Sequence, residues 1–498
     1  MLLNQETLRL VFGLKLRGLR LDKGYSLKEL SKKTGLSPSY LNEIEKGKKY
    51  PKTEKILLLA HALEEKMENL VSLELKKELQ LIQQLLDKKF LGGLPFDIFG
   101  IPTGTIFELL AEHPKKMQAL VGTLIEIARA HNIEVDDLFF ALLRSYLDMH
   151  KNHFPTLEES ANNARTEFSI NWQDAHEVLR DKLKQTLENH FKVTVQIQMN
   201  LKDIAAELAG VDHFILNKGK QLFISNSLSL AEQIFVLSRE LGYQFLKIKV
   251  RPVSSLTMHL DSFEQLFNFF SASYFASSLL IPEKIIKKDL QDFFANKTWS
   301  QAGFMDLAEK FACPIESFFH RMTQMLPRHL GIGNLFFLRY EYDDISNKYQ
   351  VERELHLSSL HAPHKVKAQE HYCSRWLVHR LTQQKIKSLK NPTSQIGIQR
   401  SSFVDSQHEY LILAASFKKD THSRKVACVC LGLLNNEILK KKIGFLEDSQ
   451  IPKFDVGETC ERCTLENCSD RQAPLDPDVS PQKFHRIFEK IQQLDDKS

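Results

Sequence analysis

Three cysteines near the C-terminal end of the chain have a spacing that suits metal binding. Cys460, Cys463 and Cys468 follow the pattern C-x-x-C-x-x-x-x-C among charged neighbours. Thiolates at this spacing bind zinc or an iron–sulfur cluster, and either one needs four ligands. We therefore predict a metal site of Cys373, Cys460, Cys463 and Cys468, with His371 as the alternative fourth ligand. Three reduced cysteines in a small metal-free knuckle are the competing interpretation.

A second group of side chains, near the start of the chain, suits DNA recognition. The stretch from Ser26 to Pro51 has the pattern of two short helices joined by a tight turn. Ser26 and Ser37 are placed to cap the two helices, because a serine hydroxyl accepts from the backbone N–H groups of a first helical turn. Gly35 suits the left-handed turn between them. The second helix is therefore predicted to enter a DNA groove.

The outward side chains of that second helix are short and polar, as contacts to base edges require. Lysines around it are placed to reach phosphates. The predicted DNA contacts are Lys28, Ser37, Ser39, Tyr40, Asn42, Lys46, Lys48 and Lys49. The alternative is a small helical hairpin with a solvated basic loop. One recognition helix reads few base pairs, so we expect a homodimer with two such heads on a double-stranded DNA operator.

The N-terminal run is similar to the Cro/repressor-like (XRE) helix-turn-helix family. The matching pattern is Gly-Leu-Ser-x-x-Tyr-Leu-x-x-Ile-Glu-x-Gly from Gly35 to Gly47, with Pro51 after it. The resemblance implies an all-α head, with a first helix around residues 14–20 and a closing helix around residues 56–63.

The middle of the chain resembles the ImmA/IrrE family of zinc-peptidase-like domains. The phrase Phe-Ala-x-x-Leu-Leu-x-Pro is present at residues 275–282. Where that family has His-Glu-Leu-Gly-His, this chain has Arg239-Glu240-Leu241-Gly242-Tyr243. Arginine and tyrosine do not replace the zinc histidines, and a catalytic zinc needs three protein ligands. We predict no catalytic residues, a Glu240 paired with Arg239 or a lysine, and a cleft that holds a ligand. A metal-dependent protease that cuts a repressor is the rival interpretation.

Length and composition limit the number of domains and the class of protein. The 498 residues are 43% hydrophobic and 26% charged, as in soluble globular proteins, and too many for one core. Lys and Arg total 67 against 62 for Asp and Glu, a mild net charge of +5. No apolar run reaches the length of a membrane span, and the start of the chain lacks a signal-peptide pattern. The seven cysteines do not form a secreted disulfide framework. A cytoplasmic protein without membrane contact is expected.

Hydrophobic periodicity gives a coarse order of elements. Helices are predicted over residues 64–90 and over 105–165. The first either packs on its own domain or carries the DNA-binding head and helps to pair two subunits. A strand is expected at 193–199, a hairpin at 213–225, and helices at 229–247 and up to 282. Residues 305–322 have a second helix-turn-helix rhythm, which we interpret as a structural subdomain. Strands are expected at 336–343, 410–415 and 426–433, with a helix beginning near residues 371–377.

These elements predict a multidomain chain: an all-α head and helical linker, an α+β peptidase-like domain, and an α+β C-terminal domain that carries the cysteine cluster. The predicted boundaries are 1–70 for the DNA-binding head and 71–165 for the helical linker and dimerisation region. They are 166–328 for the degenerate peptidase-like domain, 329–475 for the sensor-like C-terminal domain and 476–498 for a C-terminal helix or tail.

This order of parts resembles the short-chain fatty acyl transcriptional regulators of bacteria. Further matching phrases lie at residues 152–158, 336–339 and 347–348, at Cys373 with Trp376, and at the cysteine run followed by Arg471 and Pro474. The resemblance implies control of acetate, propionate or glyoxylate-cycle genes, with an acyl-CoA as the small-molecule effector. No glycine-rich phosphate loop is present in the sequence. The alternative is a regulator that senses metal or redox state through the cysteine cluster.

Overall fold

The computed structural model forms two compact units, Met1–Leu142 with Leu260–Glu264, and Leu143–His259 with Gln265–Ser498. It describes residues 5–72, 96–100, 123, 126, 135–199, 201, 208, 211–216, 219–254, 260–343, 348–357, 370–388, 394–404, 406, 408–418, 425–465 and 467–475. The predicted helix beyond residue 72, most of the predicted linker and dimerisation region, and the tail over 476–498 lie outside the described residues.

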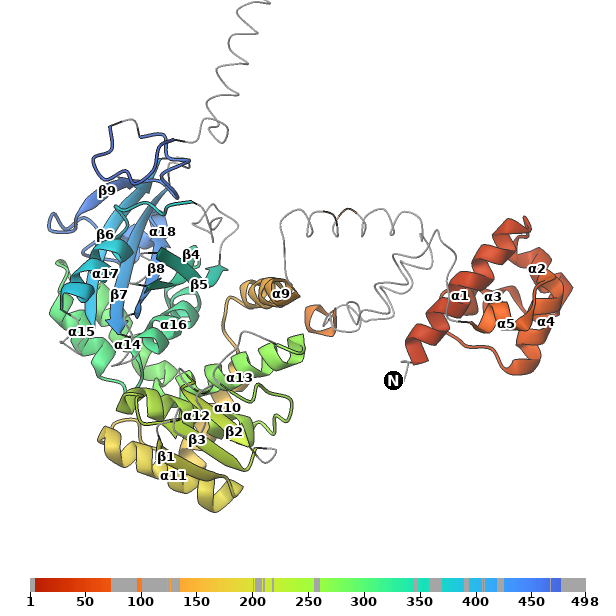
Figure 1. The fold of residues 1–498 in the computed structure, drawn as a ribbon, viewed down its shortest axis with the longest axis horizontal. Helices are drawn as coiled ribbons and strands as arrows, with labels where there is room; N and C mark the ends of the chain where they lie inside the picture. The colour runs from red at the N-terminus through yellow and green to blue at the C-terminus, as the bar shows by residue number, and fades with distance from the viewer. Residues whose placement is uncertain are drawn as a thin grey trace, which may run out of the picture. The chain divides into compact units, whose positions relative to one another are not determined.

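The head is a bundle of short helices (Figure 1). They are α1 (Gln5–Asp22), α2 (Leu27–Thr34), α3 (Pro38–Glu45), α4 (Thr53–Leu63) and α5 (Met67–Val71). One apolar cluster joins them, with Phe12 and Leu16 from α1 packed against Leu41 and Ile44 from α3. This is the all-α head that the sequence predicts. Two further elements, η2 (Phe96–Phe99) and α9 (Val135–Met149), follow along the chain.

The next region combines helices with a small sheet (Figure 1). Its first elements are α10 (Pro155–Glu167), α11 (His176–Phe191), β1 (Thr194–Met199), β2 (His213–Leu216) and β3 (Gln221–Ser225). The strand order is β1-β3-β2, with β1 parallel and β2 antiparallel to β3. The predicted strand and hairpin are therefore confirmed. Helices α12 (Leu230–Phe245), α13 (Phe263–Leu280) and α14 (Glu283–Phe294) follow.

A buried polar network ties three of these helical segments together. It is centred on Arg321 of α16 (Ile315–Met325), which follows α15 (Gln301–Glu309). The Arg321 guanidinium is fully buried and donates to both carboxylate oxygens of Glu158 on α10, at 2.6 and 2.9 Å. The Tyr274 hydroxyl on α13 donates to the same carboxylate at 2.7 Å. Burial alone would raise the pKa of Glu158, but the Arg321 charge and these hydrogen bonds hold it below its ordinary value.

Helix α16 is buried along most of its length, so the second helix-turn-helix rhythm at 305–322 belongs to the packed interior. A recognition helix needs an exposed face to enter a DNA groove. A π-helical turn, η5 (Leu326–Leu330), extends α16, and Gly331 ends it in a left-handed conformation with φ 73°.

The C-terminal region is built on a six-stranded sheet of order β5-β4-β8-β7-β6-β9. The strands are β4 (Leu335–Asp343), β5 (Lys348–Leu357), β6 (Gln395–Phe403), β7 (Glu409–Lys418), β8 (Lys425–Leu434) and β9 (Lys453–Val456). Helix α17 (Leu377–Lys387) lies between β5 and β6 in sequence, and α18 (Glu437–Lys442) follows β8. Only the β6–β9 pair is parallel among these described strands.

The two faces of this sheet contact different helices. Side chains alternate along a strand, so Phe336 and Leu338 of β4 share one face and Phe337 lies on the other. Phe336 and Leu338 pack with α17, while the Phe337 ring lies 4.1 Å, centroid to centroid, from the ring of His320 on α16. The sheet is therefore covered on one face by α17 and on the other by α16.

The helix predicted to begin near residues 371–377 is α17, which begins at the last of these residues, Leu377. The residues before Leu377 pair with a distant segment. Tyr372 forms an antiparallel bridge with Thr459, and the Cys373 N–H donates to the Glu458 carbonyl at 3.2 Å. Backbone groups committed to this bridge do not close a helical turn. Among the helices of the described ranges, none has the length and apolar character needed to cross a bilayer.

Candidate functional site

The helix-turn-helix of the head is held by the local signals that the sequence carries. The Ser26 hydroxyl accepts from the Glu29 N–H at 3.2 Å, and the Glu29 carboxylate accepts from the Ser26 N–H at 2.7 Å. Gly35 ends α2 with φ 71°. The Ser37 hydroxyl accepts from the Tyr40 N–H at 3.2 Å, with Pro38 in the first turn of α3. The predicted caps at Ser26 and Ser37 and the turn at Gly35 are all confirmed, and Glu29 completes a capping box with Ser26.

The predicted DNA contacts fall into two groups by exposure. The side chains of Lys28, Ser37, Ser39, Lys48 and Lys49 are exposed, and those of Tyr40, Asn42 and Lys46 are half-buried. All eight belong to α2, to α3 or to the residues next to α3. Their role in contacting DNA stays a prediction.

Two lysines lie near the Tyr40 ring at the end of this surface. The Lys55 ammonium is 4.1 Å from the ring centroid and the Lys49 ammonium 5.8 Å. Lys49 also pairs with Glu43 at 2.8 Å. Lys55 is therefore a further basic group beside the predicted contacts, although it lies outside the matched motif and was not predicted as a contact.

An ion pair beneath α3 fixes how that helix is presented. The Arg20 guanidinium of α1 donates to both Glu45 oxygens, at 2.6 and 2.9 Å, and also to the Tyr25 carbonyl at 2.6 Å. Both side chains are at most 10% exposed. Glu45 belongs to the matched motif, but its partner lies 25 residues away, and no local pattern identifies it.

The peptidase-like motif residues of the middle region form a closed polar network. Glu240 on α12 pairs with Arg251 at 2.6 Å and accepts from the Gln244 amide at 2.7 Å. The predicted pairing with Arg239 or a lysine is therefore wrong. Successive residues of a helix point in different directions, so Arg239 turns away from Glu240. The Arg239 guanidinium lies 2.8 Å from Nε2 of His213 on β2.

The electrostatics of this network are set by burial. Burial and the nearby Arg239 charge hold the pKa of His213 well below its ordinary value, so the ring is neutral and accepts from Arg239. Burial also raises the pKa of Glu240, with Arg251 opposing it, and raises the pKa of Tyr243 to about 12. These groups line a small open pocket. In this pocket the Glu240 carboxylate forms an ion pair with Arg251. The two positions where the zinc histidines would stand carry the cation of Arg239 and the neutral phenol of Tyr243.

The structure brings the segment of Cys373 beside the C-terminal cysteine loop. The Cys460 N–H donates to the His371 carbonyl at 2.8 Å, and the nearby Cys460 and Cys463 thiols add to burial in raising the pKa of Cys373 to about 11. Arg471 holds the loop by donating to the carbonyls of Cys460 and Cys463, at 2.6 and 2.9 Å.

Among the residues that the structure describes, no three of Cys373, Cys460, Cys463 and Cys468 have their sulfur atoms within 4.8 Å of one another, so the four predicted ligands are not gathered around one point. Metal binding there would draw the sulfur atoms together and release the thiol protons. The His371 Nδ1 lies 2.7 Å from a Glu461 oxygen. Metal binding by Cys373, Cys460, Cys463 and Cys468 stays a prediction.

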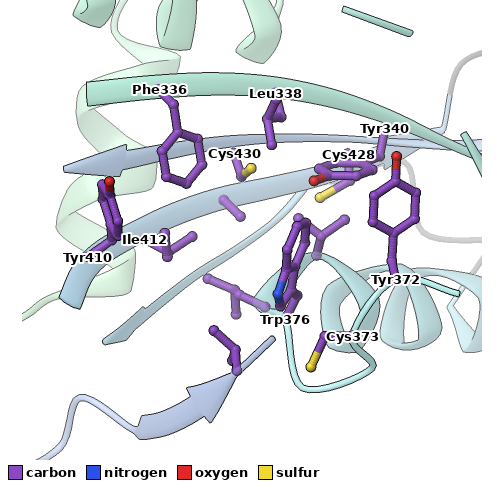
Figure 2. Packing of buried hydrophobic residues seen from close by; sticks show 14 of the residues in the cluster. Phe336, Leu338, Tyr340, Tyr372, Cys373, Trp376, Tyr410, Ile412, Cys428 and Cys430 are labelled. Carbon is purple, nitrogen blue, oxygen red and sulfur yellow. The ribbon is translucent and has the colours of Figure 1, made fainter. Parts of the chain in front are cut away.

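A small apolar pocket lies between α17 and the large sheet. Aromatic and aliphatic side chains from both layers line it, among them Trp376, Phe403 and Ile412. Figure 2 shows Phe336, Trp376 and Ile412 within the surrounding core, and Cys373 on the far side of Trp376 from the strands. The Trp376 indole N–H donates to the Gly457 carbonyl at 2.9 Å, which orients the ring. Sequence patterns did not predict this pocket, because its lining comes from separate strands and a helix.

Two family models match parts of the chain. The model described as "Helix-turn-helix" matches residues 16–70, and the model described as "IrrE N-terminal-like domain" matches residues 189–323. No curated protein sequence matches. A solved structure of a Mycobacterium tuberculosis transcriptional regulator is similar, with 18% sequence identity and a TM-score of 0.47, over 68% of this chain and 94% of that chain. The chain thus carries an XRE-type helix-turn-helix head and an IrrE-like, peptidase-related middle domain, which supports a DNA-binding regulator.

Proposed function

We propose that the protein is a cytoplasmic, sequence-specific transcriptional regulator that binds double-stranded DNA as a homodimer. The observation that carries this proposal is the capped helix-turn-helix, in which α3 presents Ser39 and Asn42 beside exposed lysines. In this interpretation Ser39 and Asn42 contact base edges, which gives sequence preference. Lys28 and Lys48 contact phosphates, which gives affinity without sequence information.

The test separates these two roles. Operator sites are first selected from fragmented genomic DNA with the full-length protein, and binding is then measured by fluorescence anisotropy. Asn42→Ala is expected to weaken operator binding by about 1–3 kcal/mol while leaving binding to unrelated DNA unchanged. Lys48→Ala is expected to weaken both equally and to reduce the slope of log K against log salt by about 1. An Asn42→Ala protein with unchanged operator preference would contradict the assigned reading face.

We further infer that a short-chain acyl-CoA is the effector and that its acyl group enters the apolar pocket beside α17. Support comes from the resemblance to the short-chain fatty acyl regulators and from the lining, which suits a short aliphatic chain. In this reading the target genes serve acetate, propionate or glyoxylate-cycle metabolism. The effector acts by favouring one arrangement of the two heads over another.

A pocket-filling substitution tests the effector proposal. Ile412→Phe is expected to lower affinity for propionyl-CoA by at least about tenfold, because lost burial of two or three methylene-sized groups exceeds 1.4 kcal/mol. Free coenzyme A is the matched ligand control, and its affinity should not change. Equal propionyl-CoA binding by both proteins would remove the pocket from the proposal, and a change in free coenzyme A binding would indicate a general distortion.

A second candidate is a regulator that senses metal or redox state, favoured by the position of Cys373 beside Cys460 and Cys463. Zinc or an iron–sulfur cluster held there would be lost in a Cys460→Ser/Cys463→Ser variant. The test is to measure the zinc and iron content and the absorption spectrum of both proteins after anaerobic purification. An iron–sulfur chromophore would make redox sensing the leading proposal, and metal-free protein would leave the acyl effector alone.

We infer that the middle domain does not hydrolyse peptides, because Glu240 is committed to Arg251 and Gln244. Cleavage of a repressor or of the chain itself by purified protein in the presence of zinc, abolished by Glu240→Gln, would overturn this inference.

A further inference from the structure

Three ligand-type side chains from distant parts of the sequence converge next to the buried Arg321 network. His153 Nε2 lies 3.1 Å and His329 Nε2 lies 2.6 Å from the same oxygen of Glu283. All three ligand atoms lie within 4.8 Å of one another. Within the part of the chain that the structure describes, this is the one group of three or more such residues with that geometry. It is separate from the Glu240 network and from the cysteine loop.

His153 is held in place by an unusual backbone. Lys151 and Asn152, directly before it, both have φ near 50°. Left-handed backbone costs a non-glycine residue about 1–2 kcal/mol, and such strain collects at functional sites. The Asn152 N–H donates to the Leu147 carbonyl at 2.7 Å, and its amide donates to the Thr323 hydroxyl at 2.9 Å. These bonds stabilise the strained turn, and the turn directs His153 inward, where its side chain is 8% exposed.

The other two residues also lie at the ends of elements. Glu283 is the first residue of α14, directly after Pro282. His329 belongs to the π-helical turn η5, and such turns occur frequently at functional sites. The two imidazole rings are nearly perpendicular, with centroids 6.1 Å apart. Each nitrogen is therefore directed at the Glu283 oxygen from a different side.

We propose that His153, Glu283 and His329 form a binding site for one divalent first-row transition-metal ion, of which zinc is the representative. Two imidazole nitrogens and a carboxylate oxygen are a ligand set that such ions accept with one or more positions left open. Ligands about 2.0–2.1 Å from a tetrahedral zinc lie roughly 3.3 Å apart. The 2.6 Å contact between His329 and Glu283 must therefore widen by roughly 0.7 Å to admit the ion, and the 3.1 Å contact between His153 and Glu283 by less. Two cations oppose a bound metal: the buried Arg321, which interacts with Glu283, and Lys287, whose exposed side chain lies one turn along α14.

A metal at this point would link three segments that the sequence keeps apart. They are the turn before α10, the start of α14 and the end of the α16–η5 helix. Strand β4 begins at Leu335, so only five residues lie between His329 and this strand. The ion would therefore sit where the peptidase-like helices lead into the large sheet, and it would stabilise that connection by mass action. This inference is independent of the proposed DNA binding and effector.

Cobalt(II) titration of the chelator-treated full-length protein tests the site. Cobalt bound by nitrogen and oxygen gives visible bands without the near-ultraviolet thiolate charge-transfer band that cobalt at the cysteine loop would give. We expect one equivalent of thiolate-free cobalt, displaced by zinc. Glu283→Gln and His329→Gln should each weaken this binding by at least about 100-fold, since even outer-shell substitutions at metal sites cost 10–100-fold.

Lys287→Gln is the matched control on the same helix. It should bind cobalt at least as tightly as the unaltered protein, because it removes a repelling charge. Circular dichroism verifies that the variants are folded, and Glu283 at 28% exposed tolerates an isosteric amide. Absence of the thiolate-free bands in the unaltered protein would overturn the proposal. So would their persistence in both ligand variants, and the three side chains would then form a hydrogen-bonded cluster only.

Discussion

The buried ion pair between Arg20 and Glu45 provides the most direct test of how the head presents its recognition helix. The substitution is Glu45→Ala, which leaves the Arg20 guanidinium without its carboxylate in a site where both side chains are at most 10% exposed. Two charge-assisted hydrogen bonds, at 2.6 and 2.9 Å, are lost. At about 1.5–3 kcal/mol for each bond to a charged group, the loss is roughly 3–6 kcal/mol.

That loss is comparable with the whole stability of the head. Breaking one side of a buried ion pair typically costs about 3–5 kcal/mol, because the remaining charge is buried and unpaired. A single core in a domain of this size supplies about 3–5 kcal/mol of net stability. We therefore expect the head of the Glu45→Ala protein to be largely unfolded at 25 °C, while the rest of the chain stays folded, and operator binding to be lost.

A double variant separates the buried charge from the pair itself. Arg20→Met with Glu45→Leu removes both charges and keeps apolar volume, so it should recover most of the lost stability, as buried pairs replaced by apolar residues often do. Hydrogen–deuterium exchange of peptides covering residues 27–45, in the full-length proteins, measures the free energy of opening the head. A loss below 1 kcal/mol for Glu45→Ala, as for an exposed pair, would refute the reasoning. Equal losses in the single and double variants would do the same.

Two further predictions follow from close packing and from buried titratable groups. Gly13→Ala should destabilise the head and weaken DNA binding, because its Cβ would lie 2.4 Å from the Ile44 carbonyl oxygen. Gly18→Ala, on the same helix with open space around it, should instead stabilise the head by about 0.5–1 kcal/mol in thermal unfolding. The half-buried His379 packs against Tyr349, and burial lowers its pKa to about 3, so the unfolded chain takes up a proton below pH 6.5 and the folded chain does not. Lowering the pH from 7.5 to 5 should therefore cost about 2 kcal/mol through this residue, and urea unfolding of His379→Phe should show a pH dependence smaller by that amount.

The parts of the fold that depend on neighbouring residues were predictable from the sequence. The capping box at Ser26, the left-handed Gly35 and the cap at Ser37 each depend on residues within three or four positions. The hairpin of β2 and β3 likewise follows from alternation around a short turn. Local hydrogen bonds decide these features, so a local pattern reveals them.

Features that depend on distant pairing were not predictable. Glu240 takes Arg251 as its partner, and Arg239 takes His213, 26 residues earlier on another element. The segment directly before α17 pairs with residues 458–460, about 85 positions further along the chain. Backbone and charge partners of this kind are chosen by tertiary contacts, and a single sequence carries no local sign of them.

The Glu158–Arg321 pair has a consequence for cutting this chain into fragments. A fragment limited to residues 189–323, the stretch that the IrrE-like family model matches, would contain the fully buried Arg321 and lack Glu158 on α10. An unpaired guanidinium in that interior costs several kcal/mol, enough to prevent folding. A fragment that begins at residue 143 keeps α10 and the pair. The N-terminal limit of the family match, residue 189, therefore differs from that of the smallest fragment expected to fold. Expression of the fragment 189–323 should give insoluble protein.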